Sequence, residues 1–235
     1  MYWIKTSHIN TIHGFSTRNG GVSPAPFLSL NLGGTEDLSE NIVENRKRAL
    51  LDLGIDMSQV SYLNQIHSNI VCQASAGKQT GDALVTNQKN IAIAVGAADC
   101  YPVLFYDEKN QVIGAAHCGW KGTLAKILNN TIDEMVRLGA EVSEIKVAIG
   151  QGICKTNYQV SEEVIQQFND AGFSKDCWES RQLDLLQANK FVAIESGIEP
   201  KNIWSMNRCT TEDDFFSYRR DNGKTGRMWA VIMLT

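Results

Sequence analysis

The sequence predicts an α+β fold in a single domain, residues 1–235, with mixed and antiparallel sheets and flanking helices. Segments of strand type and of helix type alternate irregularly along the chain. Two strands in its middle are joined closely enough to form a hairpin, which argues against a doubly wound parallel sheet. The chain has four prolines and no internal repeat or proline-rich linker at which to divide it.

The first predicted helix spans residues 39–53, with Ser39 as its N-cap. Its apolar side chains fall on one side of the helix, and Gly54 stands where a C′ glycine ends a helix. The apolar positions are Ile42, Ala49, Leu50 and Leu53.

The predicted hairpin pairs Val103–Tyr106 with Val112–His117 around a turn at 107–110. A glycine-rich turn follows, and then a helix with Thr123 as N-cap that ends at Gly139.

Two further helices are predicted, one capped by Ser161 and one that begins at Asp184 and ends at Gly197. The remaining predicted strands are short apolar runs. They are Ile91–Val95, Ile145–Ile149, Ile203–Met206 and Met228–Leu234.

Composition excludes several classes of protein. The chain is 43% hydrophobic and 20% charged, which is unlike disordered, collagen-like or charge-rich coiled-coil sequences. Its formal net charge is −4, whereas proteins that grip nucleic acid by electrostatics are usually basic. We therefore expect no nucleic-acid partner.

We expect neither a signal peptide nor a membrane-spanning segment in this sequence. The first residues, MYWIKTSHIN, lack the apolar core of a signal peptide, and the longest clean apolar run, near 91–98, is too short to cross a bilayer. We expect a cytoplasmic protein without a membrane partner, with its cysteines reduced and none in a CxxC pair. The cysteines are Cys72, Cys100, Cys118, Cys154, Cys177 and Cys209.

Cys100 and His117 lie at the paired ends of the predicted hairpin, so the fold brings them together despite their separation in sequence. With His67 they have the composition of a catalytic zinc site, in which three N/S ligands leave a fourth position open. The same Cys–His pair is also suited to act as a thiolate nucleophile and its base. The residues alone leave both interpretations open.

Two segments have the chemistry of anion sites. The turn at 119–122 joins a strand to a helix, and Lys121 adds a point charge there. The segment 207–227 is rich in arginine, tyrosine and hydroxyl groups, suited to bind phosphate or to stack on a base. The alternatives are a surface lysine and a basic loop paired with its own acidic residues.

Eight motifs spread over the chain carry a resemblance. The sequence resembles the YfiH/YlmD family of laccase-domain proteins, long described as multicopper polyphenol oxidases and since assigned purine nucleoside phosphorylase activity. The motifs are STRNGGVS (16–23), SLNLG (29–33), ENRKRAL (44–50), NQIHSNIV (64–71), GDALVT (81–86), AADCYPVLFYD (97–107), GAAHCGWKG (114–122), and RCT with FFSYRRDNGKTGR (208–227).

The resemblance implies a zinc ion held by His67, Cys100 and His117. It implies phosphorolysis of adenosine, inosine and methylthioadenosine, with an accompanying adenosine deaminase activity, so that a purine nucleoside and phosphate are the expected partners. It also implies an α+β fold related to that of the deamidating bacterial toxin CNF1, which uses a Cys–His pair.

The chain departs from the family pattern at several positions. Cys118 and Lys121 stand where the family usually has alanine and arginine, Gly33-Gly-Thr-Glu replaces a stretch that often holds a histidine, and Gly150-Gln151 replaces a Gly-Pro step. None of these is a proposed ligand. A lysine keeps the charge of an arginine but loses its bidentate geometry.

Three enzyme classes remain, and a pure binding module is a fourth alternative, favoured only if no nucleoside is turned over. For a phosphorylase, the candidate phosphate contacts are Arg46, Lys121 and Arg208, and the candidate proton-transfer groups are Asp82 and Asp99. A deaminase of the HxE…PCxxC type is excluded because that signature is absent.

A multicopper oxidase needs more imidazoles than the four histidines of this chain supply, although a single copper remains an alternative to zinc. A Cys–His amidohydrolase acting on peptidoglycan precursors would use Cys100 as nucleophile and His117 as base. Metal content separates it from the phosphorylase, because a zinc held by Cys100 consumes the thiolate.

Overall fold

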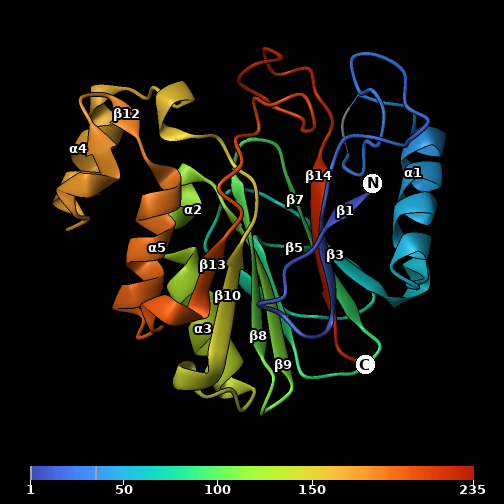
Figure 1. The fold of residues 1–235 in the computed structure, drawn as a ribbon, viewed down its shortest axis with the longest axis horizontal. Coiled ribbons are helices and arrows are strands. Elements are labelled where there is room, and N and C mark those ends of the chain that lie inside the picture. Colours follow the sequence, from blue (N-terminus) through green and yellow to red (C-terminus); the bar gives the residue numbers. More distant parts are fainter. Residues whose placement is uncertain (1, 35) are drawn as a thin grey trace.

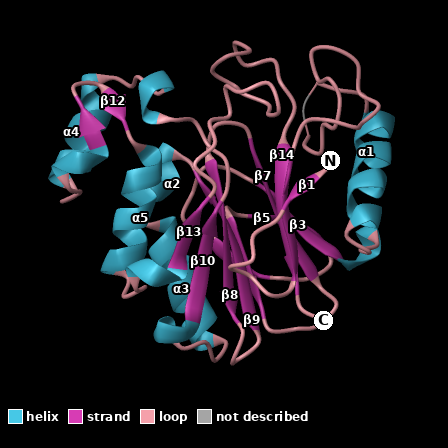
Figure 2. Ribbon diagram, in the orientation of Figure 1, coloured by secondary structure: helices cyan, strands magenta, loops and turns pink. Residues whose placement is uncertain are grey.

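The computed structural model describes residues 2–34 and 36–235 and places two six-stranded sheets face to face (Figure 1). Helix α1 (Ser39–Asp52) lies on the outer side of one sheet, α2 (Trp120–Leu124) and α3 (Ile127–Arg137) lie on the outer side of the second, and α5 (Leu185–Glu195) and α4 (Glu162–Asp170) lie beyond them (Figure 2). The predicted α+β fold with mixed and antiparallel sheets is confirmed.

The first sheet is mixed. Its strands β1, β2, β14 and β7 pair antiparallel, and β7, β3 and β5 pair parallel. In spatial order the strands are β1 (Trp3–Ile4), β2 (Ile12–Ser16), β14 (Met228–Met233), β7 (Ala92–Ala97), β3 (Val60–Asn64) and β5 (Gly77–Thr80).

The second sheet is mixed as well, with parallel pairs at its two edges and antiparallel pairs between them. In spatial order its strands are β13 (Ile203–Ser205), β10 (Ile145–Ile149), β8 (Tyr101–Asp107), β9 (Val112–Cys118), β6 (Ala83–Thr86) and β4 (Val71–Gln73). A separate small ribbon pairs β11 (Trp178–Glu179) with β12 (Gln182–Leu183).

Five α-helices complete the described fold, together with short 3₁₀ turns between elements. The α-helices are α1 (Ser39–Asp52), α2 (Trp120–Leu124), α3 (Ile127–Arg137), α4 (Glu162–Asp170) and α5 (Leu185–Glu195). The 3₁₀ turns are η1 (Met57–Gln59), η2 (Val142–Glu144), η3 (Lys155–Asn157), η4 (Lys175–Cys177) and η5 (Pro200–Asn202).

The core has three apolar layers that follow from this stacking. Side chains of both sheets meet between them, as Ile93 and Ile232 do with Leu104. Helix α1 packs through Leu50 on the first sheet, and α3 packs through Ile132 on the second. Because both faces of the central strands are buried, these strands are apolar runs without clean alternation.

Most predicted elements are present. The hairpin of β8 and β9 is confirmed, as are Asp184 as an N-cap, whose carboxylate accepts the amide of Gln187, and a left-handed Gly54 after α1. Two predicted caps are wrong. Ser39 is the first helical residue, after an N-cap at Leu38 without a side-chain hydrogen bond.

Thr123 lies inside a helix rather than at its start. The chain turns helical at Trp120, breaks at Lys126 in a left-handed conformation, and resumes as α3. The hydroxyl of Thr123 donates to the Asn189 side chain of α5, 3.1 Å away. A threonine with a tertiary hydrogen bond thus resembles a cap in sequence.

The expectation that every cysteine is a free thiol is wrong for two of them. Cys154 and Cys209 form a disulfide with their Cα atoms 5.1 Å apart, within the range that a disulfide spans. The other four cysteines are free thiols. The expectation rested on compartment alone, which does not report that two loops bring these cysteines together.

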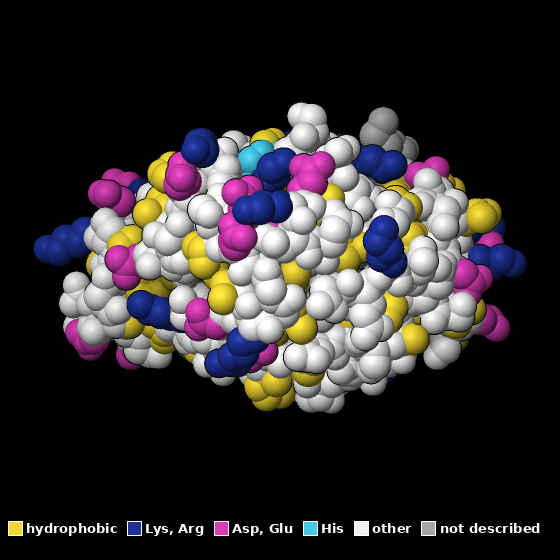
Figure 3. Space-filling view, turned by 90° about the horizontal axis from the view of Figure 1, so that it is seen from below, with side chains coloured by type: hydrophobic (Ala, Val, Ile, Leu, Met, Phe, Trp, Pro, Cys, Tyr) yellow, Lys and Arg dark blue, Asp and Glu magenta, His cyan; other side chains and the backbone are white. Residues whose placement is uncertain are grey.

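The protein surface and the helices give two further observations. On the face shown in Figure 3, basic and acidic side chains are interspersed and do not gather by sign. None of the helices in the described chain combines the length and apolar character that a membrane crossing requires.

Candidate functional site

The ends of β8 and β9 bring Cys100 and His117 together. Pro102 pairs with His117 in the hairpin, so Cys100 lies just beyond the paired residues. His67 reaches the same point from the loop after β3, and the ligand atoms of His67, Cys100 and His117 all lie within 4.8 Å of one another. The predicted meeting of these three side chains, termed the triad below, is confirmed.

A buried carboxylate supports the triad from behind. Asp82 lies 2.9 Å from His117 Nδ1 and accepts the backbone amides of Ile66, His67 and Ser68 at 3.2, 3.1 and 2.6 Å. Burial raises the pKa of Asp82, but hydrogen bonds from His117 and Ser68 outweigh it and lower the pKa to about 2. Asp82 therefore stays ionised and directs His117 Nε2 away from itself.

Cys100 and His117 favour each other's charged forms. Burial raises the pKa of Cys100, but the imidazoles of His117 and His67 outweigh burial and lower it. Burial lowers the pKa of His117, but Cys100 and Asp82 outweigh burial and raise it. A thiolate beside two imidazoles is a donor set that transition metals such as zinc accept, so the triad is a possible metal site.

Cys118 is not part of this donor set. It is fully buried in the layer between the second sheet and its helices, on the opposite face of β9 from His117. Burial, followed by the charges of Cys100 and Asp82, raises its pKa. The next residue, Gly119, lets the backbone pass close to Cys100, because a Cβ at Gly119 would lie 2.8 Å from Cys100 Sγ.

The triad opens into a cavity of about 900 Å³. That is within the size range of small-molecule sites. The described lining combines four cationic side chains, one carboxylate and several aromatic rings. The cations are Arg46, Lys78, Arg219 and Arg227, the carboxylate is Asp99, and the rings belong to Tyr62, Trp120, Tyr158, Tyr218 and Trp229.

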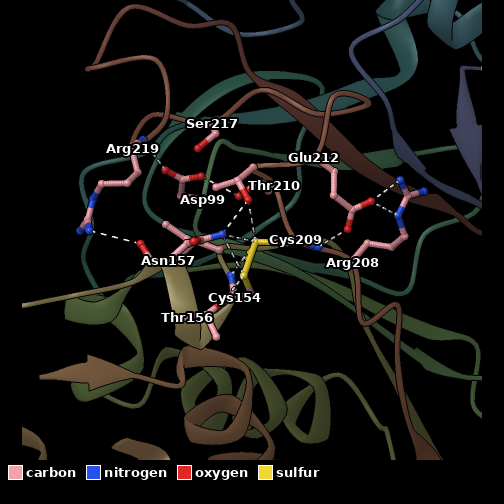
Figure 4. The surroundings of a disulfide bond; sticks show 12 residues. Asp99, Cys154, Thr156, Asn157, Arg208, Cys209, Thr210, Glu212, Ser217 and Arg219 are labelled. Carbon is pink, nitrogen blue, oxygen red and sulfur yellow. Dashed lines mark hydrogen bonds and ion pairs between the residues drawn. A yellow bond between two sulfur atoms is a disulfide. The ribbon is translucent and has the colours of Figure 1, made fainter. Parts of the chain in front are cut away.

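Asp99 joins the cavity to the disulfide loops. Its two oxygens accept the hydroxyl of Thr210 and the backbone amide of Arg219, each at 2.6 Å, and Thr210 follows the disulfide-bonded Cys209 (Figure 4). Its backbone is left-handed, with φ +86°. The carboxylate is therefore held in place immediately before Cys100.

The other predicted site residues separate into two groups. Arg46 lines the cavity, whereas Lys121 is exposed on α2 and is not part of the lining. Arg208 is also outside the lining and is paired with Glu212 and Asp214. Neither side chain lines the cavity, and the predicted roles of Lys121 and Arg208 in phosphate binding stay predictions.

Several lining residues were not assigned from the sequence. Arg219 and Arg227 lie in the arginine-rich tail, whose composition indicated a ligand site without distinguishing them from Arg208. Tyr62 and Trp229 are strand residues with no local signal. Only the pairing of β3, β7 and β14 reveals that they flank Arg46, whose Cζ lies 4.9 and 4.6 Å from their ring centres.

The sequence is similar to those of named enzymes over nearly its whole length. A "Purine nucleoside phosphorylase" of Deinococcus radiodurans is 44% identical over 235 residues, covering 98% of this chain and 92% of the relative. "Adenosine deaminase RL5" from an unknown prokaryotic organism is 29% identical over 247 residues, covering 95% of this chain and 94% of the relative.

Solved structures share the whole fold. YlmD from Geobacillus stearothermophilus superimposes with a TM-score of 0.93 at 28% identity, covering 99% of this chain and 98% of that one. The hypothetical protein YfiH of Bacillus licheniformis gives a TM-score of 0.90 at 31% identity, covering 95% and 92%. The family described as "Multi-copper polyphenol oxidoreductase laccase" matches residues 12–235. The resemblance seen in the motifs is thereby confirmed, and the chain belongs to this YfiH/YlmD family.

Proposed function

We propose that this protein is a zinc-containing purine nucleoside phosphorylase that acts on adenosine, inosine and methylthioadenosine, with adenosine deaminase as a side activity. The observation that carries the proposal is the triad of His67, Cys100 and His117 at the edge of a cavity lined by cations and aromatic rings. The activity in the names of full-length relatives supports it.

Phosphorolysis sets three demands on the residues around the substrate. A phosphate oxygen attacks C1′ of the ribose while the bond from C1′ to the purine nitrogen breaks, and the purine leaves with that electron pair and takes up a proton. The site must therefore hold an anion, seat a planar base and manage one proton. The lining offers arginines for the anion and rings for the base.

The two candidate carboxylates take different roles in this proposal. We propose that Asp99 exchanges a proton with the base or orients it, and its position as the carboxylate of the described lining supports this. Asp82 is outside the lining and ionised, and it positions His117 and the backbone at His67. We therefore treat Asp82 as a positioning residue.

In this proposal His67, Cys100 and His117 hold the ion, and Asp82 orients one of its ligands. A zinc ion in an open three-ligand site supplies a Lewis acid and a hydrolytic nucleophile near neutral pH, which suits deamination.

The activity test measures the products directly. Purified protein is incubated with adenosine, inosine or methylthioadenosine, with and without phosphate, and free base, ribose 1-phosphate and deaminated nucleoside are separated by chromatography. Base release that requires phosphate and yields ribose 1-phosphate supports the proposal. Equal release without phosphate identifies a hydrolase.

A Cys–His amidohydrolase is the second candidate, since His117 both contacts Cys100 and lowers the pKa of its thiol. Elemental analysis of protein purified without added metal separates the two. Stoichiometric zinc occupies the thiolate that the amidohydrolase requires, whereas metal-free protein that hydrolyses amides supports it.

Copper in this site remains an alternative to zinc, and the same elemental analysis identifies the metal. A multicopper centre does not fit the described residues. His13 Nε2 accepts the amide of Thr6 at 3.0 Å, and His8 Nε2 lies 2.8 Å from Asn202 O, so neither belongs to the triad. Two imidazoles are left at the triad, fewer than a trinuclear cluster requires.

A further inference from the structure

Two arginines from distant parts of the chain meet on one short segment beside the cavity. Arg46 Nε donates to Leu32 O at 2.8 Å, and Leu32 N donates to Arg227 O at 3.0 Å. Arg227 N donates to the side-chain oxygen of Asn31 at 2.9 Å. The segment 31–33 therefore holds both arginines against the same wall.

Gly33 permits this close approach. A Cβ at this position would overlap Arg227 Cβ, far inside van der Waals contact. Gly33 and Gly34 both line the cavity, so this stretch of the wall carries no side chain. Arg46 and Arg227 line the same cavity.

Neither guanidinium has a carboxylate partner among the described residues. Arg46 lies between the rings of Tyr62 and Trp229, and Arg227 Nη1 donates to the carbonyls of Thr225 and Gly226 at 3.0 and 2.9 Å. Burial lowers the pKa of both arginines, which reports the loss of water around their charges. A desolvated cation without a counterion is costly, and an anion bound there offsets the cost.

Two other arginines of the same tail differ in this respect, whereas Arg219 resembles Arg227 in donating to backbone carbonyls, those of Asn157 and Gln159. Arg208 pairs with Glu212 and Asp214, and Arg220 pairs with Asp221. Lys78 of β5 adds a further cation to the lining, next to Tyr62 through the pairing of β3 with β5. Arg46 and Arg227 are therefore lining cations without a salt bridge among the described residues, and the segment 31–33 holds them on one wall.

We propose that Arg46 and Arg227 form an oxyanion subsite that binds inorganic phosphate, with Gly33 and Gly34 giving the phosphate access to both guanidinium groups. This inference rests on the proposed function, for which phosphate is the second substrate. Arginine is suited to the task because its planar fork binds two phosphate oxygens at once. Arg46 and Arg227 line the same cavity as His67, Cys100 and His117, which relates this wall to the triad.

The experiment measures phosphate binding without turnover. Zinc-loaded protein is titrated calorimetrically with inorganic phosphate, with AMP and with adenosine, for the wild type and the variants Arg46→Met and Arg227→Met. Each variant should lose phosphate affinity by about tenfold to hundredfold, the effect of a charged hydrogen bond. Adenosine affinity and zinc content should change by less than about threefold, a difference of under 1 kcal/mol.

A matched control and a conservative variant keep the test interpretable. Arg48→Met removes the same charge from the same helix, but Arg48 is exposed and paired with Glu44, so phosphate affinity should not change. Arg46→Lys and Arg227→Lys retain the charge and should lose less affinity than the methionine variants. Melting temperatures identify any variant that is unfolded.

The outcomes separate the subsite from the function. Unchanged phosphate affinity in both methionine variants overturns the subsite, as does a loss caused by Lys121→Ala instead. AMP that binds more tightly than phosphate through the same arginines assigns the subsite to a nucleotide and overturns the assignment to free phosphate. Arginine-dependent phosphate binding together with base release that ignores phosphate supports the subsite and refutes the phosphorylase.

Discussion

The cavity has two chemically opposite walls. One is the triad wall, where the ligand atoms of His67, Cys100 and His117 lie close together. The Asp82 carboxylate adds negative charge behind them through its contact with His117. The other is the arginine wall, where Arg46 and Arg227 present positive charge without a carboxylate partner in the described chain. The triad wall is therefore suited to bind a cation, and the arginine wall is suited to bind an anion.

This difference shows that charged side chains without an ion-pair partner can indicate which ligand a cavity binds. Some half-buried ionic groups in this protein are neutralised internally, as Arg220 is by Asp221. Residues that keep an uncompensated charge beside a cavity are costly to the fold, so they indicate what the cavity binds. The following predictions test whether the walls act independently.

The largest expected effect comes from removing the ligand of the triad wall. Cys100→Ala should abolish stoichiometric zinc and reduce turnover by about a thousandfold or more, because a metal ion contributes several kcal/mol to the transition state. Metal per chain is measured by elemental analysis. Cys118→Ala removes a buried thiol from the opposite face of β9 and should keep both zinc and turnover. Zinc lost from Cys118→Ala but kept by Cys100→Ala would overturn the site assignment.

The disulfide should affect stability more than it affects either wall. Cys154 and Cys209 are 55 residues apart, and the loop-entropy relation for this separation gives a loss of about 4 kcal/mol in the free energy of unfolding for Cys154→Ser. Chemical denaturation measures the loss, with zinc content as the control that should not change. Six titratable thiols in unreduced, denatured protein, instead of four, would contradict the pairing.

Asp82→Asn should weaken the triad wall without removing a ligand. The amide keeps the shape but lacks the charge that orients His117, so zinc affinity should fall by about tenfold to hundredfold. Competition with a chromophoric chelator measures the affinity. Asp107→Asn is the matched control, since this buried carboxylate at the far end of the same hairpin accepts the amides of Asn110 and Glu141. Equal zinc affinity in the two variants would assign Asp82 a purely structural role.

Lys121→Ala should have the smallest effect. Its side chain is exposed and outside the cavity lining, so the KM for phosphate and the KM for nucleoside should both stay within about twofold of wild type, a difference of under 0.5 kcal/mol. Steady-state kinetics with each substrate varied in turn checks this. A phosphate KM that rises tenfold would contradict this expectation and support the predicted phosphate contact of Lys121.

The two walls also differ in how far the sequence predicts them. His67, Cys100 and His117 stand in recognisable motifs, and hairpin geometry places two of them together. The arginine wall has no such signal, because Leu32, Arg46 and Arg227 meet only through tertiary pairing. The same reason explains the Cys154–Cys209 disulfide, which joins loops after β10 and after β13, and the misplaced Thr123 cap, whose hydroxyl serves a contact with α5.

Two residues at the triad hold a left-handed backbone although they are not glycine. They are His67, with φ +58°, and Asp99, with φ +86°. Such conformations cost on the order of 1–3 kcal/mol each and persist only where the surroundings impose them, here the acceptance of the His67 amide by Asp82 and the two donors to Asp99. The fold thus builds a rigid receptor before an ion arrives. Stripping the ion should leave the secondary structure intact, and its return should add stability only by mass action, unlike small zinc domains that fold around their metal.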